Sequence, residues 1–410
     1  MANVSSSNGL EKRPKLRFPG FDEPWKPALL SDYFAKNIKK NADGAITNVI
    51  CNSAKQGLIP QRDYFDKDIA NSDNTDGYYI IETNDFVYNP RKSTDAPYGP
   101  ISSYKYPEAG IVSPLYLCFR AKQEINPLYF EWYFRSSAWH RYIYMSGDSG
   151  ARHDRVSIKD DTFFAMPINI PSAKEQDRIA LFLNAIEQRI DKQRSLVEAL
   201  KKYKRGVIQR VFSGRKGNGK DHCPTWEVSS FGEFFTEQII KTSNSPDTPL
   251  VSLTVEDGIT PKTERYYREF LITKEGDNYK AIKPGWFAYN PMNAHLGAIA
   301  ANHLGYTAAV SGYYNIFSAN ETDTISFWEE YLTSYPMLIH YKLIATGSLI
   351  EKQRVHYSQF VGIRRCLPSV EEQKHLSKLF EAVNKKIANA ESMERQLVRM
   401  RVSLLQQLFI

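Results

Sequence analysis

The chain has 410 residues and a mass of 47.1 kDa, a length that predicts two or three domains. Its 42% hydrophobic and 24% charged residues are typical of a globular protein, and no apolar run reaches the ~18 residues of a membrane span. The start of the chain has no basic region followed by an apolar stretch, so we expect a cytoplasmic protein without a secretory signal. The net charge of +7 permits binding to nucleic acid without requiring it.

Residues 1–24 are expected to form an N-terminal extension, and residues 25–169 a first globular domain. Short β-type runs alternate in this domain with Asn, Asp, Gly and Pro, a pattern typical of strands joined by turns. The runs expected as strands are residues 77–81, 86–88, 111–112 and 115–119. A short helix is expected near residues 128–144, so the domain mixes helix and strand.

Residues 170–213 predict one long helix. Ser172 followed by Glu175 is a capping box, and Pro171 prevents the helix from beginning earlier. Apolar residues then alternate at spacings of four and three over five heptads, broken only by Gln193 and Lys204, which is typical of a coiled coil. The expected seam consists of Ile179, Leu183, Ile186, Ile190, Val197 and Leu200, and continues at Val207 and Val211.

Residues 214–225 are expected to form a linker. Residues 214–220 match the spacing of a phosphate-binding loop, but Asp221 stands where Ser or Thr would bind magnesium. The segment also follows a helix rather than a strand, and Pro224 would interrupt a helix after it. A nucleotide site is therefore not expected here.

The remaining chain repeats this order, with a second globular domain at 226–366 and a second long helix at 367–410. Residues 170–176 recur at 367–373, and the Phe-x-Tyr-Asn-Pro run at 86–90 recurs at 287–291. Trp25 has its counterpart in Trp226, and a second short helix is expected near 327–343. Ser369 and Glu372 repeat the capping box. The second seam, broken by Glu394 and Arg401, consists of Leu376, Phe380, Val383, Ile387, Ala390, Leu397, Leu404 and Leu408.

We therefore predict an α+β fold with a pseudo-two-fold internal repeat. Two similar mixed α/β domains would be held apart by two long antiparallel coiled-coil helices, because antiparallel pairing places the globular parts at opposite ends. At ~1.5 Å per residue, a helix of about 40 residues is ~60 Å long.

Polar and basic residues gather at matched places of the two globular parts, after the Tyr-Asn-Pro turn and again after a glycine further on. Arg, Asn and Lys are the side chains that read base edges and contact phosphates. The residues expected to bind DNA in the first copy are Asn89, Arg91, Lys92, Tyr98, Tyr104, Lys105, Arg152, His153 and Arg155. Those in the second copy are Asn290, Asn293, His295, His303, Lys352, Arg354 and His356.

No catalytic or metal site is expected. Asn89-Pro90 and Asn290-Pro291 lack the second Pro and the aromatic residue of the adenine-methyltransferase signature, so both more simply end a strand at a turn. His295 and His303 have no carboxylate or Cys at ligand spacing. The four cysteines, which contain no C-x-x-C pair, are Cys51, Cys118, Cys223 and Cys366.

These features together resemble the specificity subunit of type I restriction-modification systems. Residues 14–21, Trp25 and residues 30–32 look like the N-terminal conserved segment of that family. Residues 170–176 and 367–373 resemble the L-P-x-x-E-Q start of its two conserved helices, with Ile170 in place of the usual Leu. The resemblance covers essentially the whole chain, but the recognition domains of this family diverge too widely for any base contact to be transferred.

The resemblance implies that residues 25–169 and 226–366 are target recognition domains that read a bipartite double-stranded DNA site with a non-specific spacer. It implies a non-catalytic chain whose helices bind two modification subunits, which carry S-adenosylmethionine and methylate adenine. Restriction subunits that use ATP and Mg would join this core.

Two alternatives remain open from the residues alone. The chain could be a coiled-coil scaffold whose globular ends bind proteins, a function that its Tyr-rich surface permits. A self-contained methyltransferase or restriction enzyme is disfavoured by the missing cofactor and nuclease motifs.

Overall fold

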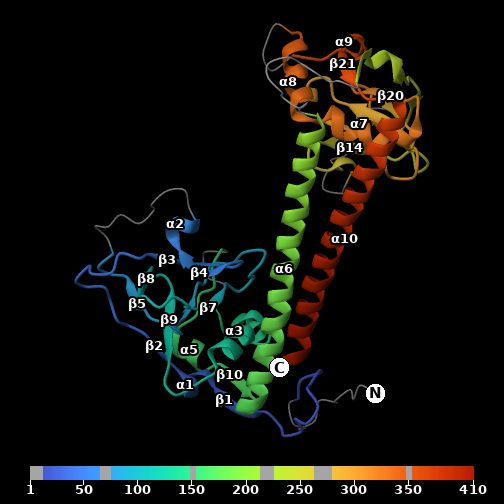
Figure 1. Ribbon diagram of the computed structural model, residues 1–410. Helices are drawn as coiled ribbons and strands as arrows, with labels where there is room; N and C mark the ends of the chain where they lie inside the picture. The colour runs from blue at the N-terminus through green and yellow to red at the C-terminus, as the bar shows by residue number, and fades with distance from the viewer. Residues whose placement is uncertain (1–12, 65–74, 148–153, 213–225, 263–278, 348–352) are drawn as a thin grey trace. The chain divides into compact units, whose positions relative to one another are not determined.

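The computed structural model describes residues 13–64, 75–147, 154–212, 226–262, 279–347 and 353–410 (Figure 1). The chain divides into two compact units, of which unit 1 comprises Met1–Gln193 with Met393–Ile410 and unit 2 comprises Arg194–Ser392. Each unit therefore contains one globular part and about half of each long helix. The domain bounds expected from the sequence, which list the helices apart from the globular parts, are a finer division of the chain and stay a prediction.

Unit 1 is built on a four-stranded antiparallel sheet of order β2 (Phe34–Lys36), β9 (Leu117–Ala121), β6 (Phe86–Tyr88) and β7 (Ile101–Ser103). Three strand pairs flank it, namely β1 (Lys26–Leu29) with β10 (Pro167–Ile170), β3 (Ile50–Ser53) with β4 (Gly57–Pro60), and β5 (Tyr79–Ile81) with β8 (Gly110–Val112). Its short helices are α1 (Leu30–Tyr33), α2 (Gln61–Tyr64), α3 (Pro127–Arg135), α4 (His140–Ser146) and α5 (Asp160–Phe164). The helix expected near 128–144 is thus two helices, because the backbone turns extended at Ser136.

Unit 2 repeats this plan. Its four-stranded sheet has the order β12 (Phe235–Glu237), β20 (Asn315–Ala319), β17 (Phe287–Tyr289) and β18 (Ile299–Ala301). The flanking strands are β11 (Glu227–Ser230) with β21 (Arg364–Leu367), β14 (Val251–Thr254) with β15 (Gly258–Pro261), and β13 (Lys241–Thr242), β16 (Tyr279–Ile282) and β19 (Ala308–Ser311). The helices are α7 (Ile325–Leu332), α8 (Tyr335–Ile344) and α9 (Tyr357–Val361), with 3-10 turns η2 (Phe231–Glu233), η5 (Ala294–Leu296) and η6 (Thr322–Thr324). The internal repeat predicted from the sequence is confirmed.

Buried aromatic rings form the core of each unit. In unit 1 the Phe34 ring lies 5.2 Å from Phe119 and 4.9 Å from Phe130, both edge to face. In unit 2 its counterpart Phe235 lies 4.8 Å from Phe317 and 4.6 Å from Trp328. Edge-to-face packing adds to the stabilisation that burial gives, so much of the aromatic content serves the two cores.

The first long helix, α6 (Ala173–Phe212), begins as the sequence predicts but uses its glutamate differently. The Ser172 Oγ accepts a hydrogen bond from the Glu175 N–H at 3.4 Å, and Gln176 Nε2 donates to the carbonyl oxygen of Pro171 at 3.1 Å. The Glu175 carboxylate, however, accepts two hydrogen bonds from Arg17, at 2.7 and 2.8 Å. Glu175 therefore holds the N-terminal segment rather than completing a capping box.

The second long helix, α10 (Val370–Leu408), begins in the same way. The Ser369 Oγ accepts from the Glu372 N–H at 3.3 Å, and Gln373 Nε2 donates to the carbonyl oxygen of Pro368 at 2.9 Å. The Glu372 carboxylate accepts from Trp226 Nε1 at 3.1 Å. In both copies the glutamate thus joins the helix start to a residue at or before the start of the globular part.

The long helices run antiparallel within each unit (Figure 1). In unit 1, Ile186 and Ile190 near the middle of α6 pack on Leu397 of α10. In unit 2, the end of α6 meets the start of α10, where the rings of Phe212 and Phe380 lie 5.9 Å apart. No helix in the described part of the chain has the length and apolarity needed to cross a membrane.

The predicted seam residues lie in the helix interfaces to different depths. The buried ones are Ile179, Leu183, Ile186, Ile190, Val197, Phe380, Val383, Ala390, Leu397 and Leu408, and the half-buried ones are Leu200, Val207, Val211, Leu376, Ile387 and Leu404. Two of the polar breaks form ion pairs: Lys204 reaches Glu330 of α7, and Arg401 lies 2.6 Å from Glu187. At Lys204 and Arg401, specific charged contacts therefore replace seam packing.

Candidate nucleic-acid interface

The strand β6 ends at a turn that Asn89 fixes. Its Oδ1 accepts a hydrogen bond from the Arg91 N–H at 3.1 Å, and its Nδ2 donates to the carbonyl oxygen of Asn52 at 3.2 Å. Asn290 forms the same turn after β17, where its Oδ1 accepts from the Met292 N–H at 3.1 Å. Asn suits this place because its side chain mimics a backbone turn. The Tyr-Asn-Pro runs mark strand ends, as the sequence predicts, and both Asn side chains shape the backbone.

The turn brings together the two basic segments predicted in unit 1. Arg91 and Arg155 face each other in an antiparallel bridge, and the Lys92 N–H donates to the carbonyl oxygen of Asp154 at 2.8 Å. Residues more than 60 positions apart in the chain therefore present their cations from one place.

The equivalent segments also meet in unit 2. The Val355 N–H donates to the carbonyl oxygen of Pro291 at 3.0 Å, directly after the Asn290 turn. The neighbouring Arg354 guanidinium lies 5.2 Å from the centre of the Tyr313 ring and donates to its hydroxyl at 3.2 Å. The Tyr313 ring thus holds the Arg354 guanidinium. This contact uses one of its five N–H donors, so others can bind a ligand.

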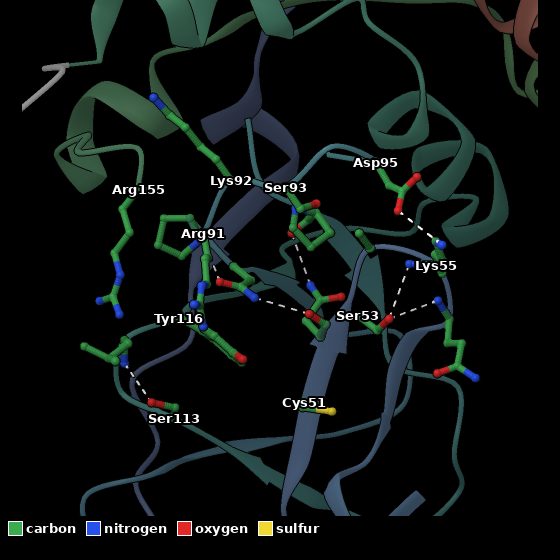
Figure 2. Close-up of a pocket in the computed structure, with 17 residues that line it drawn as sticks. Cys51, Ser53, Lys55, Arg91, Lys92, Ser93, Asp95, Ser113, Tyr116 and Arg155 are labelled. Atoms are coloured by element: carbon green, nitrogen blue, oxygen red, sulfur yellow. Dashed lines mark hydrogen bonds and ion pairs between the residues drawn. The ribbon is translucent and has the colours of Figure 1, made fainter. Parts of the chain in front are cut away.

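A hollow of about 700 Å³ opens beside the turn of unit 1 (Figure 2). Arg91 and Arg155 line one flank and Lys55 the opposite flank, with Lys92 above them. Asp95 is the acidic side chain among the lining residues, and its carboxylate lies 3.6 Å from Lys55. The four cations outnumber the nearby carboxylates of Asp95 and of Asp154, which lies 3.8 Å from Arg155, and so attract anions. A pair as exposed as Lys55 and Asp95 is easily exchanged for another partner.

The floor of the hollow is a fixed hydrogen-bond network around the buried Asn52. Its Nδ2 donates to the carbonyl oxygen of Val87 at 2.8 Å, and its Oδ1 accepts from Ser102 at 2.8 Å. Gly99 ends a turn in which its N–H donates to the carbonyl oxygen of Ala96, and it has a φ of +82°. A Cβ atom added at Gly99 would lie 2.1 Å from the carbonyl oxygen of Asn89. Only glycine fits there. The rim cations thus project from a rigid frame.

Lys105 and His303 take equivalent places, each two residues beyond a sheet strand, and each is paired with a glutamate of the following helix. The Lys105 ammonium lies 2.9 Å from Glu131, and His303 Nε2 lies 2.9 Å from Glu329. The hydrogen bond that His303 donates to the Glu329 carboxylate raises the pKa of His303. Each glutamate supplies the countercharge that a phosphate would supply, so the geometry favours a stabilising contact over DNA contact at both positions.

The prediction for Tyr104 is wrong. Its ring is fully buried in the core between β3, β6 and β8, and its hydroxyl donates to the carbonyl oxygen of Glu108 at 2.9 Å. Tyr98 is half-buried, with its ring 4.8 Å from that of His140. Tyrosine frequency alone does not separate core rings from surface rings, because the phenol suits both.

The other predicted residues differ in exposure. Asn293 is exposed, and His295 is half-buried in η5. His356 is exposed and precedes α9, where its N–H donates to Gln359. Arg152, His153 and Lys352 lie outside the described residues, as do residues 214–225 with the phosphate-loop-like spacing and Cys223. For the described surface residues, DNA contact stays a prediction.

The sequence reasoning missed Lys55 and Gln56, which line the hollow from the turn between β3 and β4. Nothing in the local sequence marks them, since they precede the Tyr-Asn-Pro turn by more than 30 residues. Cys51 also lines the hollow, and burial raises the pKa of its thiol. No group of three His, Cys, Asp or Glu side chains that could hold a metal ion occurs among the described residues.

No protein-family model matches the chain, and no curated protein matches it in sequence. Among solved structures it is similar to the S subunit of a type I restriction-modification system from M. genitalium, with 13% identity, a TM-score of 0.56 and coverage of 97% of this chain and 99% of that one. It is also similar to a chain from a structure that describes complex assembly and conformational transition of the type I R-M system, with 14% identity, a TM-score of 0.57 and coverage of 96% and 99%. The chain therefore has the fold of a type I restriction-modification specificity subunit, as the resemblance in its sequence predicts.

Proposed function

We propose that this chain is the sequence-specific DNA-binding subunit of a type I restriction-modification complex. The observation that supports this most strongly is the fold likeness to an S subunit over nearly the full length of both chains. A likeness limited to one globular part would fit many functions. This one extends over the duplicated globular part and both long helices. Because a fold alone does not define a function, the surface residues carry the rest of the argument.

In this proposal each unit reads one half of a bipartite DNA site. The rim of Arg91, Lys92 and Arg155 offers phosphate contacts on a rigid frame in unit 1. The units share a backbone plan but differ in their exposed side chains, so they would prefer different half-sites. Phosphate contacts would position each unit, and the divergent side chains would specify bases.

The long helices would bind two modification subunits. Large apolar side chains whose positions along each helix differ by seven or fourteen residues stay exposed outside the seam, which is typical of a face that receives another helix. They occur in both copies at positions 197 residues apart. The unit 1 members, exposed by 36–43%, are Phe182, Met393 and Met400, and their unit 2 counterparts, exposed by 40–58%, are Leu379, Leu196 and Tyr203. The Phe182 ring is partly covered by Phe18, whose ring centre lies 5.4 Å away.

Chemistry would then reside in the partners. The modification subunits would hold S-adenosylmethionine and transfer its methyl group to adenine, and restriction subunits would use ATP and Mg. The role of this chain would be non-catalytic: it selects the site and fixes where the partners act.

The experiment that tests the proposal is adenine-methylation mapping of the host genome with and without the gene for this chain. We expect a gapped two-part motif in the parent, its loss in the deletion strain, and its return with the full-length chain. Return should fail with the triple variant Arg91→Ala, Lys92→Ala, Arg155→Ala. An unchanged methylation pattern in the deletion strain would contradict the proposal.

A further inference from the structure

The hairpin that borders the hollow has the same backbone in both units. In unit 1, β3 pairs with β4 from Ile50 opposite Pro60 to Ser53 opposite Gly57. In unit 2, β14 pairs with β15 in the same register, which ends with Thr254 opposite Gly258. Gly57 and Gly258 both take a positive φ, at +72° and +63°. The loop between the strands therefore has one length and one exit geometry.

A matched side chain also holds the turn. The Ser53 Oγ accepts a hydrogen bond from the Gln56 N–H at 3.3 Å, and Thr254 Oγ1 accepts from the Asp257 N–H at 3.0 Å. A hydroxyl that bonds a backbone N–H three residues on stabilises a turn. The two hairpins thus share their strand register, their loop length and this hydrogen bond.

The side chains that the turn displays are opposite in charge. Unit 1 presents Lys55 and Gln56, and unit 2 presents Glu256 and Asp257 at the same places. All four residues are exposed. Lysine and glutamine can donate hydrogen bonds, whereas ionised carboxylates only accept them.

The turn lies beside the predicted DNA-contact residues in each unit. In unit 1, Lys55 and Gln56 line the same hollow as Arg91. In unit 2, a methyl group added at Gly297, which follows η5, would lie 3.8 Å from Val255 Cγ1. The turn and the segment after the Asn290 turn are therefore neighbours there too.

A phosphate contact explains Lys55 but not its counterparts. Carboxylates are repelled by phosphates, so Glu256 and Asp257 would gain from DNA only by accepting from a base amino group, such as cytosine N4. Lys55 would instead donate to guanine O6 and N7, and Gln56 to adenine. The same hairpin therefore presents donors in unit 1 and acceptors in unit 2, which suits two different half-sites.

We propose that this turn is a specificity-determining element in each unit, with Lys55 and Gln56 reading bases for unit 1 and Glu256 and Asp257 for unit 2. The inference rests on the proposed function and names residues that carry it.

The test exchanges the turn residues within the full-length chain. Lys55→Glu with Gln56→Asp gives unit 1 the charges of unit 2, and Glu256→Lys with Asp257→Gln does the reverse. Randomised DNA duplexes are selected with each protein, both alone and as the complex purified from its host. We expect each variant to change the bases of one half-site, with the original site bound about tenfold more weakly than the newly selected one.

Three controls make the outcomes distinct. Lys26→Glu, an exposed change on β1 away from the hollow, should leave both half-sites unchanged, and thermal unfolding should show that all variants fold. If charge reversal abolishes binding, Lys55→Ala with Gln56→Ala should relax one half-site. Failure of the parent chain to select any two-part motif would contradict the proposed function. A two-part motif that all turn variants retain would overturn this inference alone.

Discussion

Lys105 in unit 1 and His303 in unit 2 are structural counterparts that meet equivalent glutamates, Glu131 and Glu329, at the same distance of 2.9 Å. The position keeps an ion pair although the cation has changed. An ammonium stays charged throughout the neutral range, whereas an imidazole does not. The two units should therefore respond differently to pH.

The first prediction is that His303→Gln destabilises the protein only at low pH. Glu329 raises the pKa of His303 from its ordinary value of about 6.5. A group whose pKa is raised by folding stabilises the fold below its unfolded pKa, and this contribution is lost as the pH rises through the folded pKa. Because the imidazole is 64% exposed, the loss should stay below ~1 kcal/mol. Thermal unfolding at pH values on either side of the transition measures it.

Lys105→Gln is the matched control. Lysine has no imidazole to lose its proton in this range, so the loss in unfolding free energy should be similar at both pH values. Equal losses at both pH values for His303→Gln would show that its contact with Glu329 is not governed by protonation.

The second prediction concerns the N-terminal segment, which Arg17 anchors to α6. Glu175 is 1% exposed, so Arg17→Met leaves a buried carboxylate without its guanidinium and should cost about 3 kcal/mol of unfolding free energy. The Leu16 N–H, which donates to the carbonyl oxygen of Gln407 at 3.0 Å, should exchange with solvent faster. Urea unfolding and hydrogen exchange measure both effects.

The contact between Trp226 and Glu372 in unit 2 tests whether the cost comes from a buried, unpaired charge. Trp226 is a neutral donor to the half-buried Glu372, so Trp226→Phe should cost only about 1 kcal/mol. Adding Glu175→Gln to Arg17→Met should recover part of the stability, since it removes the unpaired charge. A double variant no more stable than Arg17→Met would contradict the buried-charge explanation.

The long helices were predictable because their signals are local. The spacing of Ile179, Leu183 and Ile186, and the serine caps Ser172 and Ser369, depend on residues within one or two turns. The duplication then indicated that the second half of the chain repeats the plan of the first. Comparison of the two copies within one chain therefore indicated the domain organisation, which one copy alone would not show.

The candidate site was less predictable because it depends on pairing across long stretches of chain. Tyr104 is polar enough for a surface, but strand pairing turns it into the core. The sequence suggests a phosphate contact for Lys105, but in the folded protein helix α3 places Glu131 2.9 Å from it. Lys55 joined the site only through the hairpin, which no spacing relates to Arg91. Charge and residue type indicate which part of the chain contains the candidate site. Only the contacts made in the folded protein decide which residues belong to it.

The third prediction separates free from neutralised cations. If Lys92 contacts a phosphate, Lys92→Ala should lower DNA affinity and reduce the slope of log K against log salt by about 0.9. Lys105→Ala should reduce the slope less, because its ammonium is already paired with Glu131, a carboxylate that also pairs with Arg135. Binding isotherms at several salt concentrations give both slopes. Equal slope changes for the two variants would assign Lys105, too, to the DNA interface.

The fourth prediction tests partner binding by the long helices. Tyr203→Glu in unit 2 and Met400→Glu in unit 1 place a carboxylate in the exposed apolar faces, where an interface would leave it desolvated and unpaired. Native mass spectrometry of the complex purified from its host should then show one modification subunit instead of two for each variant, and none for the double variant. Lys202→Glu, an equally exposed change on a neighbouring face of α6, should retain both. Because the wild-type residues contribute little to the fold, loss of subunits without loss of thermal stability would assign these faces to docking, whereas two retained subunits in the double variant would place docking elsewhere.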